Sequence, residues 1–304
     1  MTARRQRGNP VDGVLLLDKP RGITSQTAVS RVKRLFAAAK AGHTGTLDPL
    51  ADGLLPVCFG EATKFSQGLL DATKRYRAVL RLGVTTTTGD LEGEVLSQQA
   101  CAGDARTIEG ALGRFRGDIV QIPPMYSALK RNGKPLYAYA RAGHELVREP
   151  RRVHIGELSL KSVDGADVAI SVTCSKGTYV RVLAEDIGKA LGCGACLAAL
   201  TRTRVGDLEL AQAVALPVLE AMSVEERSRR LLPADVLVAA LPRLDLDSAE
   251  AGSIRVGRPV IRGTPGLPDL ARAYDPAGRF VGLVGADAEG RIVPRRLVSS
   301  SAVS

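Results

Sequence analysis

GHTGTLDPLADG, residues 42–53, is the most informative stretch of this 304-residue chain. Gly45 and Pro49 interrupt regular backbone structure and the flanking segments are apolar, so we expect a loop here. Asp48 directly precedes Pro49, which disfavours the α conformation at Asp48 and favours extended backbone. The pattern predicts a carboxylate held on a shaped loop with His43 nearby, the kind of segment that carries function. An ordinary turn with Asp48 as a local cap is the alternative.

The segments around this loop have the periodicity of short strands and helices. Residues 13–17 are expected to form a strand, and Ser25 is expected to cap a helix that runs to about Ala38. Aliphatic and polar residues alternate over residues 76–82, which predicts a strand with Tyr76 on its aliphatic, inward face.

Periodicity also predicts strands and helices further along the chain. Residues 178–191 have apolar side chains at helical spacing, so Tyr179 and Arg181 fall in the first turn of a predicted helix. We also expect a polar loop over 85–93, helices over 62–70 and 107–115, and strands over 57–59, 152–160 and 167–175. Strands and helices mixed in this way predict an α+β fold.

The chain is long enough for two domains, and a charged segment marks the expected division. Residues 225–230, followed by Pro233, are interpreted as a hinge that separates residues 1–232 from residues 233–304. Beyond this hinge, short apolar runs separated by Gly, Pro and Asp predict a small β-rich domain; the runs are 241–246, 257–261, 271–274, 280–286 and 292–297.

The charge of the chain favours a polyanionic partner. It has 42 Lys and Arg against 32 Asp and Glu, a net charge of +10. Residues 125–152 alone hold seven basic residues against two acidic ones. This local excess suits phosphate contacts, whereas a solvated charged surface or the arginine content of a GC-rich genome is the alternative explanation.

Several classes of protein are disfavoured. The sequence has no run of about 18 apolar residues, and no apolar core follows its basic start, so we expect no membrane span, no signal peptide and a cytoplasmic location. Five cysteines, an odd number, argue against a disulfide framework, and Cys193 and Cys196 form a lone C-x-x-C. Metal-ligand spacing and phosphate-binding glycine loops are missing from the sequence, so we expect neither metal nor cofactor.

Six short motifs, in order over roughly residues 13–206, resemble those of the TruB family, the bacterial tRNA pseudouridine-55 synthases. The segment around Asp48, continued through Lys64, resembles the catalytic motif of that family. The other motifs are DKPRG at 18–22, KRY at 74–76, PPMYSALK at 123–130, SKGTYVR at 175–181 and LTRT at 200–203. The resemblance implies a mixed-sheet catalytic domain followed by a small PUA-like RNA-binding domain.

The resemblance also implies roles for individual residues. Asp48 matches the nucleophile, Arg181 the cation that places it, and Tyr76 an aromatic residue that stacks on the flipped uracil and acts as acid or base. Tyr179 and Leu200 would line the same pocket. Without the motifs, Arg181 is interpreted as a helix-surface cation, Tyr76 as a half-buried strand residue and Leu200 as core.

Further residues are expected to meet the RNA. His43 resembles the residue that stacks in the place of the flipped base, although a lone histidine is usually structural. The candidates for pocket support or phosphate contact are Lys19, Lys64, Lys130, Arg202 and Arg204.

The implied function is isomerisation of uridine 55 in the T-loop of tRNA, by a monomer without cofactor, guide RNA or obligatory protein partner. Residues 125–152 resemble the thumb of the family, a basic insertion that closes on RNA; a pair of ordinary surface helices is the alternative. Two rival functions stay open. One is the guide-RNA-dependent enzyme of box H/ACA particles, and the other is a non-catalytic tRNA-binding or folding factor with residues 42–45 as a GXXG-like loop.

Overall fold

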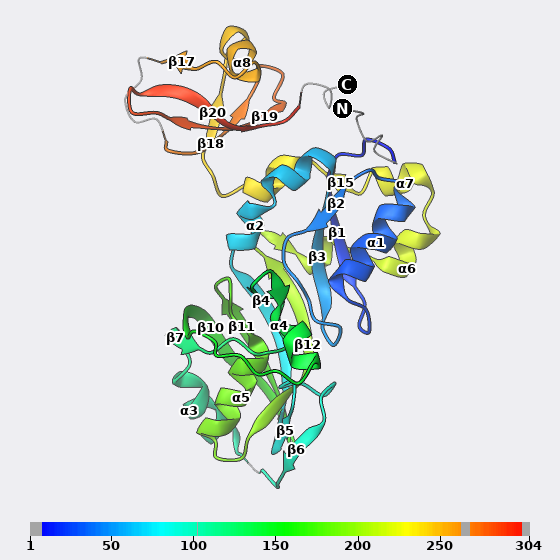
Figure 1. Ribbon diagram of the computed structural model, residues 1–304, viewed down its shortest axis with the longest axis vertical. Coiled ribbons are helices and arrows are strands. Elements are labelled where there is room, and N and C mark those ends of the chain that lie inside the picture. Colours follow the sequence, from blue (N-terminus) through cyan, green and yellow to red (C-terminus); the bar gives the residue numbers. More distant parts are fainter. Residues whose placement is uncertain (1–7, 102, 263–267, 300–304) are drawn as a thin grey trace.

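The computed structural model describes residues 8–101, 103–262 and 268–299, which form one large mixed sheet, a second smaller sheet and surrounding helices (Figure 1). The large sheet has eleven strands. Its main path runs β14 (Val214–Ala215), β1 (Gly13–Lys19), β3 (Asp52–Phe59), β12 (Ala195–Val205), β4 (Lys74–Leu82), β11 (Asp167–Cys174), β10 (Arg151–Asp164) and β7 (Gly117–Gln121). Beside this path, β2 (Ala41–His43) pairs with β3, β13 (Leu208–Glu209) with β12, and β15 (Leu231–Leu232) with β1.

Three helices cover much of the apolar surface of this sheet. α1 (Ser25–Leu35) begins after Thr24, whose hydroxyl accepts a hydrogen bond from the Thr27 N–H, so the cap is Thr24 and not Ser25. α3 (Ala105–Gly113) packs against β10, and α5 (Val180–Ala190) packs against β12 (Figure 1). Further helical segments are η1 (Gly60–Phe65), α2 (Gln67–Asp71), η2 (Leu210–Gln212), α6 (Leu216–Ala221) and α7 (Val224–Ser228).

The two halves of the large sheet join at a short parallel contact between β3 and β12. Asp52 lies opposite Thr201, and Gly53 lies opposite Arg202. Gly53 has φ +98°, and a Cβ there would lie 2.4 Å from the Arg202 carbonyl oxygen, so only glycine permits this approach. The contact brings the end of the loop predicted around Asp48 directly beside β12.

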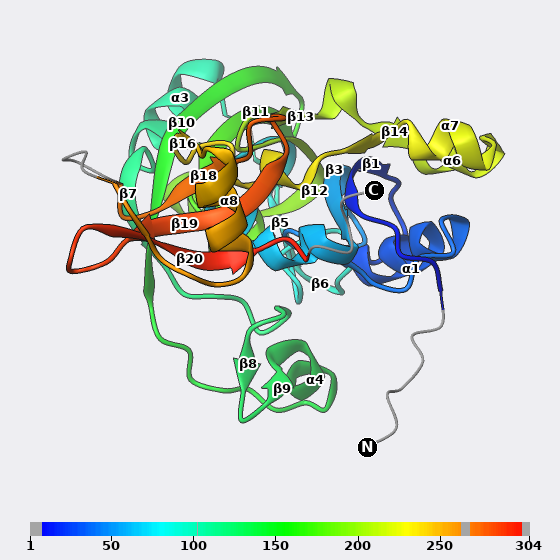
Figure 2. The same ribbon diagram turned by 90° about the horizontal axis from the view of Figure 1, so that it is seen from above.

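The basic insertion forms a separate small unit. Figure 2 shows β8 (Lys130–Arg131), β9 (Lys134–Pro135) and α4 (Leu136–Arg141) standing off the sheet on two extended segments. The alternative of a surface helix pair is wrong for this segment, because a two-stranded hairpin precedes its one short helix.

The C-terminal part forms a second sheet with a core of its own. Its strands are β16 (Arg243–Asp245), β18 (Ala271–Tyr274), β19 (Phe280–Ala286), β20 (Arg291–Leu297) and β17 (Val260–Ile261), in that order across the sheet. The sequence did not indicate α8 (Ser248–Arg255), whose Ala251 and Ile254 are buried in this core. The predicted α+β class, with a mixed sheet and a small β-rich C-terminal domain, is confirmed.

The segment interpreted as a hinge packs on the first domain instead. The Arg227 guanidinium donates to the carbonyls of Leu35, Leu219 and Glu220, which ties α7 to the end of α1. η3 (Ala234–Val238) also packs on this domain, against η1 and α2. We therefore propose that the two domains divide a few residues after the expected position at 232–233.

The predicted polar loop over residues 85–93 overlaps a hairpin, β5 (Val84–Thr86) and β6 (Val95–Gln98). After this hairpin, Cys101 forms a disulfide with Cys193, which follows α5, with a Cα–Cα distance of 5.8 Å. The odd cysteine count did not anticipate this pair, because 92 residues separate the two cysteines and only the fold brings them together. Cys196, the other member of the C-x-x-C, is a buried thiol.

Candidate active site

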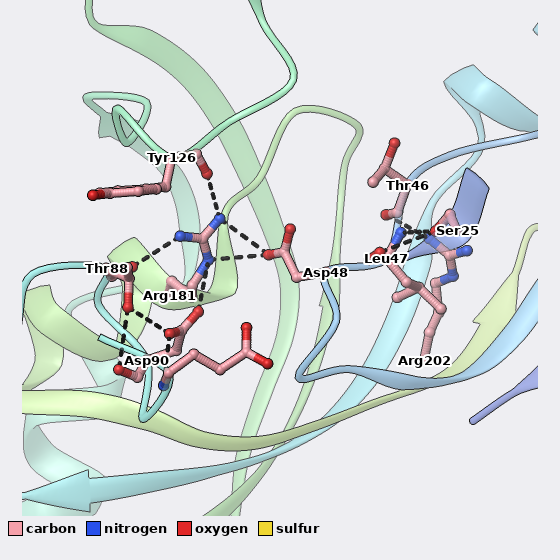
Figure 3. Close-up of polar contacts among 10 residues, drawn as sticks. Ser25, Thr46, Leu47, Asp48, Thr88, Asp90, Tyr126, Arg181 and Arg202 are labelled. Carbon is pink, nitrogen blue, oxygen red and sulfur yellow. Dashed lines mark hydrogen bonds and ion pairs between the residues drawn. The ribbon is translucent and has the colours of Figure 1, made fainter. Parts of the chain in front are cut away.

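Asp48 lies on the loop between β2 and β3, and this loop is tied to the start of α1 (Figure 3). Ser25 Oγ accepts a hydrogen bond from the Leu47 N–H at 2.8 Å and donates to the Leu47 carbonyl at 3.0 Å. Leu47 is buried, whereas the neighbouring Asp48 side chain is 41% exposed. The predicted loop is therefore shorter than residues 42–53, since β2 and β3 take its ends, and it presents one carboxylate.

Arg181 occupies the first turn of α5, and acceptors surround its guanidinium (Figure 3). Its Nε and Nη2 each lie 3.0 Å from Asp48 Oδ2. Nη1 donates to the Thr88 carbonyl at 2.8 Å, and Nη2 donates to the Tyr126 carbonyl at 2.7 Å. The Arg181 side chain is 6% exposed, so it is not a helix-surface cation; its charge-assisted bonds orient Asp48.

Asp90 is a member of this cluster that no motif indicated. Its Oδ2 lies 3.6 Å from Arg181 Nε, and its side chain is 5% exposed. The Thr88 hydroxyl donates to Asp90 Oδ1 at 2.5 Å, and the Glu92 N–H donates to the same oxygen at 3.1 Å. The only local signal was the turn tendency of Gly89 before Asp90, because carboxylate burial depends on contacts with α5. The Arg181 guanidinium thus forms ion pairs with two carboxylates, those of Asp48 and Asp90.

A cavity of about 350 Å³ opens beside Asp48. The residues that the motifs implied for the pocket meet around it: Asp48, Tyr76, Tyr179, Arg181 and Leu200. Burial raises the pKa of both tyrosines, and nearby Arg202 offsets this only in part at Tyr76, so both phenols are protonated at neutral pH. The cavity therefore combines an exposed carboxylate, a buried cation and two neutral phenols.

Arg202 was expected at the RNA backbone, and this expectation is wrong. It is 1% exposed, and its guanidinium is directed at the carbonyls of Leu54, Thr46 and Gly45. Residue 202 lies on β12 opposite Tyr76 of β4, and its side chain lines the cavity beside Asp48. Arg204 differs, because its side chain is 39% exposed and pairs with Asp207.

The three candidate lysines lie apart from the cavity walls. Lys19 is buried and its ammonium donates to the carbonyls of Pro20 and Ile23; burial lowers the pKa of Lys19 to about 8. Lys64 pairs with Glu61 at 2.7 Å and donates to the Leu297 carbonyl at the end of β20. Lys130 is exposed on β8 of the insertion. Lys19 thus supports a turn, and Lys64 joins the two domains.

His43 lines a second cavity, of about 530 Å³, which also has Asp48 in its wall. Gln26 of α1 and Tyr137 and Arg141 of α4 complete its walls. Burial and the charge of Arg202 lower the pKa of His43, so its imidazole is neutral at pH 7. The Gly45 N–H donates to His43 Nδ1 at 3.2 Å, which fixes the ring plane at the edge of the loop.

Within the described ranges, 8–101, 103–262 and 268–299, no group of three or more His, Cys, Asp or Glu is arranged to hold a metal ion. In the same part of the chain, no helix is both long enough and apolar enough to cross a membrane.

Comparison with protein families places almost the whole chain in one lineage. Residues 33–180 match the N-terminal domain of the TruB family pseudouridylate synthases. Residues 181–239 match the tRNA pseudouridylate synthase B C-terminal domain, and residues 242–298 match the C-terminal domain of pseudouridine synthase II TruB.

Individual relatives agree with the family models. tRNA pseudouridine synthase B of Thiobacillus denitrificans is 58% identical over 95% of this chain and 97% of its own length. That of Burkholderia pseudomallei strain K96243 is 54% identical over 98% of this chain and 97% of its own length.

Solved structures share the fold at lower identity. One, described as a Cbf5-Nop10-Gar1 complex, is 26% identical with a TM-score of 0.70, over 93% of this chain and 85% of the matched chain. The archaeal box H/ACA sRNP Nop10-Cbf5 complex is 25% identical with a TM-score of 0.68, over 99% and 87%. Because relatives above 50% identity match along nearly its full length, the chain belongs to the TruB family and is a pseudouridine synthase.

Proposed function

We propose that this protein isomerises uridine 55 in the T-loop of tRNA, in the cytoplasm, with Asp48 as the nucleophile and without a guide RNA. The observation that carries the proposal is the exposed Asp48 carboxylate, which Arg181 holds at the mouth of a cavity walled by Tyr76 and Leu200. The relatives named tRNA pseudouridine synthase B, at 54–58% identity, support tRNA as the substrate class.

The reaction needs no net oxidant, reductant or group donor, because product and substrate are isomers. The N1–C1′ glycosidic bond breaks, the base turns within the site, and a C5–C1′ bond forms; the proton lost from C5 is balanced by a proton gained at N1. Asp48 supplies a nucleophile that attacks either the ribose or the base. Tyr76 stands in the same cavity as a protonated phenol that is suited to exchange a proton with the ring.

The uridine must leave the RNA stack to reach Asp48. A cavity of about 350 Å³ accommodates a single base, with the Tyr76 ring and the Leu200 side chain as apolar walls. The neutral imidazole of His43, in the adjoining cavity, suits stacking on an RNA base. The two cavities share Asp48 and Arg181, so a flipped base and the loop it left would lie on either side of the nucleophile.

The insertion supplies an RNA-facing wall for both cavities. Ser127 and Ala128, at its root, line both, and Tyr137 and Arg141 of α4 line the second. Because the Tyr126 carbonyl accepts a hydrogen bond from Arg181, the root of the insertion is coupled to the group that orients Asp48. We propose that this thumb, with exposed Lys130, closes on the RNA backbone.

A guide-dependent enzyme is the rival with the same fold, because one reported solved neighbour is an archaeal box H/ACA complex that contains Cbf5 and the other is also a Cbf5 complex. The identity to those structures, 25–26%, is less than half of the identity to the tRNA pseudouridine synthase B relatives. This difference favours an enzyme that acts on tRNA, and we propose that it does so alone, as a monomer.

The test is pseudouridine formation in an unmodified tRNA T-stem-loop, with purified protein and no added RNA, protein or cofactor. Wild type should convert the T-loop uridine, and Asp48→Asn should bind the stem-loop with similar affinity and convert none. A stem-loop whose T-loop uridine is replaced by cytidine is the substrate control. Tight binding without conversion by wild type would contradict the proposal and leave a guide-dependent enzyme or an RNA-binding factor.

A further inference from the structure

Arg202 is a cation buried without a neutralising partner. Among the described residues, Arg202 has the largest residue volume of all fully buried side chains, and it is 1% exposed. None of the ion pairs within the described residues includes Arg202, whereas Arg181 is paired with Asp48 and Asp90. Burying an unpaired charge is costly, so a guanidinium at this position demands strong compensating hydrogen bonds.

Those bonds come from backbone carbonyls on both sides of the Asp48 loop. Arg202 Nε donates to the Leu54 carbonyl at 2.8 Å. Nη2 and Nη1 are directed at the carbonyls of Gly45 and Thr46, at 3.2 Å and 3.4 Å. One rigid, planar group therefore spans the loop from its start to its end, which a lysine cannot do.

Arg202 also lies opposite Tyr76 in the large sheet. Arg202 and Tyr76 are direct partners in the register between β12 and β4, and both line the cavity beside Asp48. A guanidinium has donors only and carries a positive charge, so it disfavours a phenol proton that points toward it. The phenol proton is then free to point away from Arg202, into the cavity that Tyr76 lines.

We propose that Arg202 is a positioning residue of the isomerisation. It holds the Asp48 loop through the backbone carbonyls of that loop, and it orients the Tyr76 hydroxyl toward the flipped uracil. This inference rests on the roles proposed above for Asp48 and Tyr76. Arg202 also lines the cavity, but its guanidinium is engaged by backbone carbonyls, so it acts through Asp48 and Tyr76 and not as a reacting group.

The chain offers a matched control in Arg227. Its guanidinium also binds three backbone carbonyls, those of Leu35, Leu219 and Glu220, but it lies outside both cavities. Arg227→Met should therefore cost stability like any lost carbonyl-binding arginine, with no change in conversion per folded molecule.

The experiment compares Arg202→Met, Arg202→Lys and Arg227→Met in the full chain. We expect Arg202→Met to slow single-turnover conversion of saturating T-stem-loop about 100-fold, with nearly unchanged stem-loop affinity. Arg202→Lys should recover part of the rate. The ¹³Cζ signal of Tyr76, identified by its loss in Tyr76→Phe, should shift in Arg202→Met and stay in place in Arg227→Met.

A rate for Arg202→Met that matches Arg227→Met would overturn the inference, and so would a Tyr76 signal that does not move. If Arg202→Met fails to fold, Arg202→Lys carries both measurements. Wild-type conversion in the same assay distinguishes failure of the proposed function from failure of this inference. If wild type is inactive, the proposed function fails; if wild type is active and Arg202 variants behave like Arg227→Met, only this inference fails.

Discussion

Two ionic clusters in this protein have opposite composition. In the active site one buried guanidinium, that of Arg181, lies between the carboxylates of Asp48 and Asp90. In the C-terminal domain one buried carboxylate, that of Asp275, lies 2.6 Å from Arg255 Nη2 and 2.9 Å from Arg279 Nε. The Asp48 side chain is 41% exposed, whereas that of Asp275 is 2% exposed.

The comparison separates a reactive cluster from a stabilising one. Asp275 Oδ1 accepts hydrogen bonds from the backbone N–H groups of Ala277 and Arg279, and Oδ2 takes both arginines, so the carboxylate is saturated. Asp48 is held through Oδ2 and stands at a cavity. The same ion-pair chemistry therefore holds a turn in one domain and, in the other, holds the carboxylate that we propose as the nucleophile.

Arg181→Met should have the largest effect on stability. It leaves the buried Asp90 carboxylate without its cation, so the free energy of unfolding should fall by about 3–5 kcal/mol. Conversion should be lost at the same time, because Asp48 loses both orienting N–H groups. Urea denaturation checks the first effect. Arg181→Lys, which keeps the charge without the fork, should lose less stability.

Asp275→Asn should cost about 2 kcal/mol, because the amide keeps only one acceptor oxygen and its NH2 group leaves two of the four present donors without an acceptor. Calorimetry should assign the loss to unfolding of the C-terminal domain, while the rate of stem-loop conversion stays near that of wild type. A fall in that rate as large as in Arg181→Met would remove the distinction between the two clusters.

Acid should weaken the ionic cluster around Asp275 in the C-terminal domain. Burial raises the pKa of Asp275, but hydrogen bonds from Arg255 and Arg279 outweigh this and lower it from 3.8 to about 2. The carboxylate therefore stabilises the folded state fully above about pH 4, and this contribution is lost as the pH falls toward 2. The stability difference between wild type and Asp275→Asn, measured by thermal unfolding, should shrink over that window. A difference that stays constant would show that ionisation of Asp275 is not its source.

Asp90→Asn should have the smallest effect on stability, about 1 kcal/mol, because an amide oxygen can still accept from Thr88 and the Glu92 N–H. The substitution removes one of the two negative charges beside Arg181, so Asp48 is then the only ion-pair partner that orients the guanidinium. Conversion should slow about tenfold, less than in Arg181→Met. Single-turnover kinetics checks this, with Asp90→Ala expected to be more severe because Thr88 loses its acceptor.

Much of the site was accessible from the sequence. The turn residues around Asp48 and the alternation that turns Tyr76 inward are local patterns, and the motifs implied a pocket that also holds Tyr179, Arg181 and Leu200. These residues do line one cavity. The same patterns misplaced Arg202 at the surface and gave no sign of Asp90, since periodicity carries no information about which buried face a polar side chain meets.

Local patterns in the chain were sufficient for the loop and for most strands and helices, because turns and periodicity depend on neighbouring residues. The family and the candidate nucleophile came from the resemblance of its six motifs. The tertiary structure was needed for every long-range partner. Arg181 reaches Asp48 across 133 residues, Arg202 reaches Gly45 across 157, and Lys64 reaches Leu297 across 233. Whether a cation binds RNA, clamps a loop or joins two domains is set by the groups that folding places around it.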